Sequence, residues 1–71
     1  MSFYVIVGGG GIKLVAPAGS SDRYCDYIED AQCYRTFVRA SRDVDSESGE
    51  TVRSVGLGRH DDIAFPKNLL Q

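Results

Sequence analysis

The sequence has little of what small proteins use to build a stable core. Its 71 residues include no tryptophan, three phenylalanines, two cysteines, two prolines and one histidine. A chain of this length buries only about 60% of the surface that it exposes when unfolded, so one core gives marginal stability. A homodimer that shares a core or continues a sheet would compensate for this deficit.

The chain also lacks long apolar runs, which excludes a membrane-spanning helix of roughly 20 residues. Ala16-Pro17-Ala18 resembles a signal-peptidase site, but four glycines divide the apolar segment before it and no basic residue precedes that segment. We therefore expect a cytoplasmic protein with no membrane partner. Cys25 and Cys33 are expected to be reduced in that compartment.

The charge balance excludes a strongly basic protein. Eight basic and ten acidic residues give a formal net charge of −2 and a pI of about 5.1. Bulk electrostatics therefore do not predict nucleic-acid binding. The 42% hydrophobic content is ordinary for a globular domain, and we expect residues 1–71 to form one small domain.

No stretch supplies a complete cofactor site. The strand-like residues 5–7 and the glycines 8–11 resemble the start of the Rossmann fingerprint of FAD- and NAD-binding domains. That fingerprint needs a third glycine and a following helix, whereas Lys13 or Leu14 stands at the third position and Pro17 would break the helix. We expect a glycine turn here and no cofactor.

Metal and catalytic sets are also incomplete. Residues 43–49 resemble a calcium loop, but the glycine is seventh instead of sixth and Ser54 replaces the twelfth-position glutamate. Cys25, Cys33 and His60 could support a thiol- or metal-dependent activity only if the fold brings them together. We expect a solvated acidic turn, no metal, no catalytic residue and no enzyme.

The expected fold class is α+β, with a hairpin, a short helix, a second hairpin and a short C-terminal strand. The first hairpin pairs residues 3–7 with 12–16 around the glycines. Helical spacing of Tyr24, Tyr27, Ile28 and Ala31 predicts a helix over residues 21–33. The alternative is a strand that turns at 29–32 into a second strand, which would give an all-β SH3-like barrel.

The second hairpin is expected between residues 36–38 and 51–55, which are rich in β-branched and aromatic side chains. The acidic residues between them would form the turn. A short edge strand is expected at 63–65, with Leu69 and Leu70 docking on the core.

Two charged surfaces are candidates for binding a partner. The acidic face would consist of Asp22, Asp26, Glu29 and Asp30. The arginine and aromatic face would consist of Tyr34, Arg35, Phe37, Arg39 and Arg53. The simpler interpretation is that these arginines pair with Asp43, Asp45 and Glu50 across the second hairpin.

From size and charge we expect a non-enzymatic module that binds a protein partner. It would act as an inhibitor or accessory subunit of a larger protein or nucleoprotein, as small proteins of phages and mobile elements do. The alternative is a module that binds single-stranded nucleic acid through the arginine and aromatic face.

Overall fold

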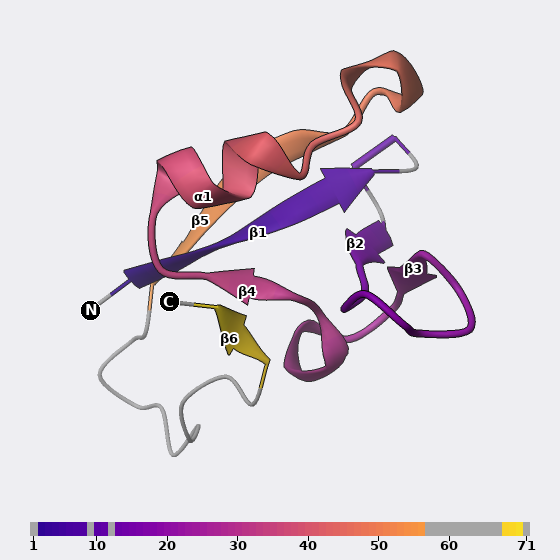
Figure 1. The fold of residues 1–71 in the computed structure, drawn as a ribbon, viewed down its shortest axis with the longest axis horizontal. Coiled ribbons are helices and arrows are strands. Elements are labelled where there is room, and N and C mark those ends of the chain that lie inside the picture. Colours follow the sequence, from indigo (N-terminus) through magenta and orange to yellow (C-terminus); the bar gives the residue numbers. More distant parts are fainter. Residues whose placement is uncertain (1, 9, 12, 57–67, 71) are drawn as a thin grey trace.

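The centre of the fold is the strand β1 (Ser2–Gly8), which pairs with three other strands (Figure 1). Along one edge it pairs antiparallel with the whole of β5 (Thr51–Gly56). Its other edge is shared by β4 (Cys33–Tyr34) near the start and β2 (Lys13–Val15) near the end. The computed structural model describes residues 2–8, 10–11, 13–56 and 68–70.

Two very short strands extend this sheet. β3 (Tyr24–Cys25) pairs antiparallel with β2, and β6 (Leu69–Leu70) pairs parallel with β4. One helix, α1 (Phe37–Arg42), packs on β1, β4 and β5. The architecture is a small α+β domain, which confirms the fold class expected from the sequence.

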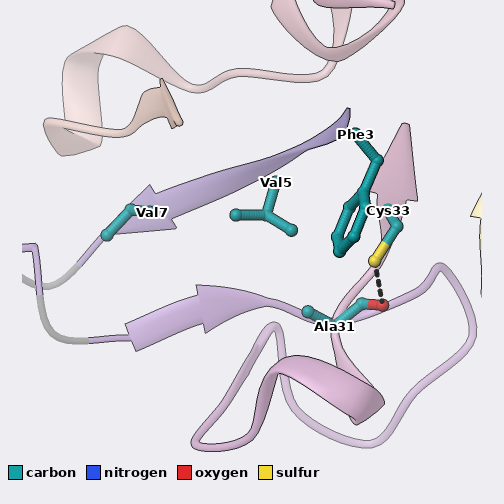
Figure 2. Packing of buried hydrophobic residues seen from close by; sticks show 5 residues of the cluster. All are labelled: Phe3, Val5, Val7, Ala31 and Cys33. Atoms are coloured by element: carbon teal, nitrogen blue, oxygen red, sulfur yellow. Dashed lines mark hydrogen bonds between the residues drawn. The ribbon is translucent and has the colours of Figure 1, made fainter. Parts of the chain in front are cut away.

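Alternation along β1 gives the sheet two buried faces, because successive side chains of a strand point to opposite sides. Phe3, Val5 and Val7 form one cluster with Ala31 and Cys33 (Figure 2). Ile6 belongs to the other cluster, which lies on the side of α1 and also contains Val15, Tyr34 and Ala40. The core is therefore built from a few mostly small side chains on both sides of one strand.

The predicted first hairpin is confirmed, with Val7 opposite Leu14 and Gly8 opposite Lys13. The turn closes through a hydrogen bond from the Gly11 N–H to the Gly8 carbonyl at 3.1 Å. The docking of Leu69 and Leu70 is also confirmed, since one packs against each cluster. The strand predicted at 63–65 lies outside the described residues.

The predicted helix over residues 21–33 is wrong. This segment holds β3, a single 3-10 turn η1 (Ile28–Asp30) and β4, which resembles the alternative of two strands joined by a turn. The physical reason is tertiary: β2 and β1 offer open edges whose backbone groups need partners, and these outweigh a weak helical periodicity. The all-β barrel is excluded by α1.

The predicted second hairpin is also wrong, because residues 37–42 form α1 and β5 pairs with β1 instead. The Thr36 hydroxyl accepts a hydrogen bond from the Arg39 N–H at 3.2 Å, which caps the helix start. Ala40 is fully buried against Ile6 and Tyr34, where a small side chain allows close approach of the helix to the sheet.

In the described part of the chain, no helix has the length and apolar content needed to cross a membrane.

Gly8 provides a stability test of this packing. A methyl group at Gly8 would lie 2.7 Å from Cε1 of Tyr24 and 3.2 Å from Cγ of Glu50. We expect Gly8→Ala to lower the free energy of unfolding by about 1–3 kcal/mol, measured by urea denaturation. The control is Gly56→Ala, where no described atom beyond the chain neighbours lies within 4 Å of the added methyl group. Equal stability of the two variants would contradict the close packing at Gly8.

Candidate protein-binding surface

The carboxylate of Glu50 is the best-supported polar group in the structure. Its side chain is fully buried, and Arg23 donates to both of its oxygens, from Nε at 2.9 Å and from Nη2 at 2.7 Å. The Tyr24 hydroxyl donates at 2.6 Å, and the Asp45 N–H donates at 2.9 Å. With four donors on one carboxylate, the cost of burying the charge is compensated.

The local chain explains how Glu50 turns inward. Residues 46–48 form a 3-10 turn, η2 (Ser46–Ser48), which ends at Gly49 with a φ of 77°. This left-handed conformation favours glycine and reverses the chain directly before β5. Glu50 then lies over Gly8, where the missing side chain leaves room for its Cγ atom.

The expectation that Glu50 pairs with arginines of a second hairpin is wrong, because its partner is Arg23. The hydrogen bonds from Arg23 and Tyr24 lower the pKa of Glu50 to about 2, although burial opposes this shift. The same carboxylate raises the pKa of Arg23 and of Tyr24 through hydrogen bonds. Glu50 is thus a structural anion with no free oxygen for chemistry.

Two strongly exposed apolar side chains lie on α1. Phe37 and Val38 are 56% and 63% exposed, and the Phe37 ring contacts Tyr4 edge to face at a centroid distance of 6.1 Å. Arginines surround them in the sequence and are exposed. We define the α1 surface as Arg35, Phe37, Val38, Arg39 and Arg42. Among the described residues, no acidic side chain forms an ion pair with its arginines.

Of the five residues predicted for the arginine and aromatic face, Phe37 and Arg39 are exposed on α1, and Arg35 is exposed two residues before it. Tyr34 is 2% exposed and cannot stack on a ligand, since its ring belongs to the core. Arg53 lies opposite Val5, so its side chain is on the face of the sheet away from α1.

A groove of about 360 Å³ borders the α1 surface. Arg39, Arg23, Gln32 and Asp43 provide its polar lining, and Tyr34 lies at its wall. The Tyr34 hydroxyl donates to Oδ2 of Asp43 at 2.7 Å. Burial is the larger cause that raises the pKa of Tyr34, and this hydrogen bond raises it further. Arg23 already pairs with Glu50, so Arg39 is the arginine of the groove that forms no ion pair with any other described residue.

The residues predicted for the acidic face are all exposed, but they do not share a helix. Asp22 precedes β3, Asp26 follows it and forms an ion pair with Lys13, and Glu29 and Asp30 lie in η1. This acidic segment lies away from α1 (Figure 1). It also exposes Tyr27 and Ile28.

The two cysteines are free thiols in a packed environment. Cys33 is fully buried and donates to the Ala31 carbonyl at 3.6 Å (Figure 2), while Cys25 is half-buried. Burial raises the pKa of Cys33 to about 11 and also raises the pKa of Cys25. Neither thiol is therefore activated as a thiolate. His60 lies outside the described residues, among which no cluster of metal ligands is found.

The pairing of Arg23 with Glu50 was not predicted from the sequence. Their separation of 27 residues exceeds any local rule of side-chain spacing, so only the tertiary structure could reveal it.

The Glu50 network makes stability depend on pH in a defined direction. Because folding lowers the pKa of Glu50 from 4.5 to about 2, the stabilisation is complete above about pH 4.5 and is lost as pH falls toward 2. We expect Glu50→Gln to remove up to about 3 kcal/mol of stability at neutral pH and to flatten this acid dependence.

The measurement is the free energy of urea unfolding between pH 2 and 7. Glu47→Gln is the matched control, since Glu47 is exposed in the neighbouring η2 turn and should leave the profile unchanged. If Glu50→Gln and the wild type showed the same dependence of the unfolding free energy on pH, the structural role of this carboxylate would be contradicted.

Comparisons with protein-family models, with curated proteins and with solved structures found no match to this chain.

Proposed function

We propose that this chain is a non-enzymatic protein-binding module that acts as an inhibitor or accessory subunit of a larger protein or nucleoprotein. The observation that supports this is the α1 surface, where two large apolar side chains are more than half exposed. Exposed apolar side chains that adjoin each other, surrounded by polar groups, are typical of protein interfaces. Aromatic and arginine side chains are also enriched there.

The chemistry of the surface defines the partner. Phe37 and Val38 would enter an apolar depression, and their removal from water would supply most of the binding energy. Arg35, Arg39 and Arg42 would pair with carboxylates at its edge, which guanidinium groups bind in a bidentate manner. The expected partner is thus a protein with an apolar pocket that acidic side chains surround.

Single-stranded nucleic acid is the second candidate, and the α1 surface favours it less. Such binding uses several aromatic side chains on which successive bases stack. Phe37 is the only aromatic residue of the α1 surface, because Tyr34 is buried.

The test is affinity purification of the tagged protein from its native host, with nuclease treatment and elution in salt steps. We expect a stoichiometric protein partner that survives nuclease and high salt. The variant Phe37→Ser/Val38→Ser should reduce its capture at least about tenfold, since it removes two interface anchors.

Tyr27→Ser is the matched control, because Tyr27 is 64% exposed but lies in the acidic segment. Circular dichroism of all variants verifies that they fold. If the Tyr27 variant loses the partner and the α1 variant keeps it, the acidic segment is the interface. Capture that disappears with nuclease or at moderate salt would instead favour nucleic acid.

A further inference from the structure

β5 has a free edge in the described part of the chain. It pairs with β1 along its full length, whereas no strand pairs with its other side. Thr51, Arg53, Ser54 and Gly56 are exposed. No proline or lysine interrupts this edge, although such residues commonly protect edge strands from pairing. At six residues it is much longer than the terminal strands β3 and β6, which have two residues each.

The hydrogen bonds of the sheet show which groups of β5 point outward. The Cys33 N–H donates to the carbonyl of Asn68, directly before β6, at 3.0 Å. The Arg35 N–H donates to the carbonyl of Leu70, in β6, at 3.1 Å. The backbone groups of Tyr34 between them therefore point to Tyr4 of β1. Since the backbone groups of a strand alternate between its edges, those of Phe3, Val5 and Val7 point to β5.

The pairing of β1 with β5 then shows which backbone groups of β5 point to β1 and which point outward. Phe3, Val5 and Val7 lie opposite Val55, Arg53 and Thr51, whose backbone groups point back to β1. The N–H and C=O groups of Val52, Ser54 and Gly56 consequently point away from the sheet. No hydrogen bond to these backbone groups is found among the described loops and turns.

We propose that β5 pairs antiparallel with β5 of a second copy of this chain, with the two Ser54 residues opposite each other on a two-fold axis. This register pairs Val52 with the partner's Gly56 and uses all three outward-facing residues of each strand. It places Arg53 opposite the partner's Val55, so no like charges face each other. A register centred on Arg53 would instead oppose two guanidinium groups.

A second copy fits this edge better than an unrelated strand, because one symmetric contact satisfies both free edges and closes the assembly. It also gives a small domain the additional buried surface that its own core lacks. The axis passes close to the α1 surface, since Ser54 lies opposite Tyr4, which Phe37 contacts. The dimer would present two α1 surfaces on the same side of one continuous sheet.

The first test measures the mass of the purified protein by light scattering over a range of concentrations. We expect the wild type to reach twice the chain mass of 7.8 kDa. Ser54→Pro should remain monomeric, because proline removes an outward N–H and leaves the bonds to β1 in place. Ser54→Ala keeps that N–H and should still dimerise. A wild type that remains monomeric at millimolar concentration would overturn the proposal.

The second test does not depend on the folding of the proline variant. In a Cys25→Ser background, Ser54→Cys should form a disulfide between copies under mild oxidation, several-fold faster than Arg53→Cys. The reason is that Ser54 faces its own counterpart, whereas Arg53 faces the partner's Val55. Equal rates for the two variants, or a dimer that Ser54→Pro leaves intact, would overturn this register. Neither test involves the protein partner. Failure of the dimer proposal can therefore be distinguished from failure of the proposed function.

Discussion

The structure depends on one buried carboxylate and the donors that bind it. Glu50 carries its charge in a position with no exposed side-chain surface, and Arg23 and Tyr24 come from a segment distant in sequence to neutralise and bind it. The bond from the Asp45 N–H adds the preceding turn to the same centre. Removal of any donor would leave a buried anion incompletely bonded, which is costly. This carboxylate therefore fixes β3, the η2 turn and β5 relative to each other.

The second constraint is that one strand provides the core for the whole chain. β1 is bordered on both edges and covered on both faces, so its apolar residues are enclosed from four directions. Gly8 stands at the end of β1, where only a residue without a side chain leaves room for the Tyr24 ring and Glu50. A chain without tryptophan thus builds its core by surrounding a central strand instead of by packing large side chains.

Several apolar and basic side chains lie outside the core. Phe37 and Val38 do not complete the core but extend from a six-residue helix together with arginines. The thiols, by contrast, are packed and not activated, and the carboxylate with the most perturbed pKa has all its bonding capacity in use. The α1 surface is the exposed apolar feature on which the proposed binding function depends. The free edge of β5 next to α1 is where a second copy would add to it.

Local sequence determined the first hairpin, the α+β class and the docking of Leu69, since alternation and glycine turns act over a few residues. It did not determine where the helix lies. The apolar spacing in residues 21–33 and the β-branched residues near Thr36 were each compatible with two structures, and strand edges elsewhere decided between them. Likewise, Phe37, Arg35 and Arg39 could be proposed as one surface from spacing alone. Only the tertiary structure decided that Tyr34 is buried, that Arg53 lies on the other face and that Glu50 bonds Arg23. The reason is that contacts between distant segments depend on how the sheet is ordered.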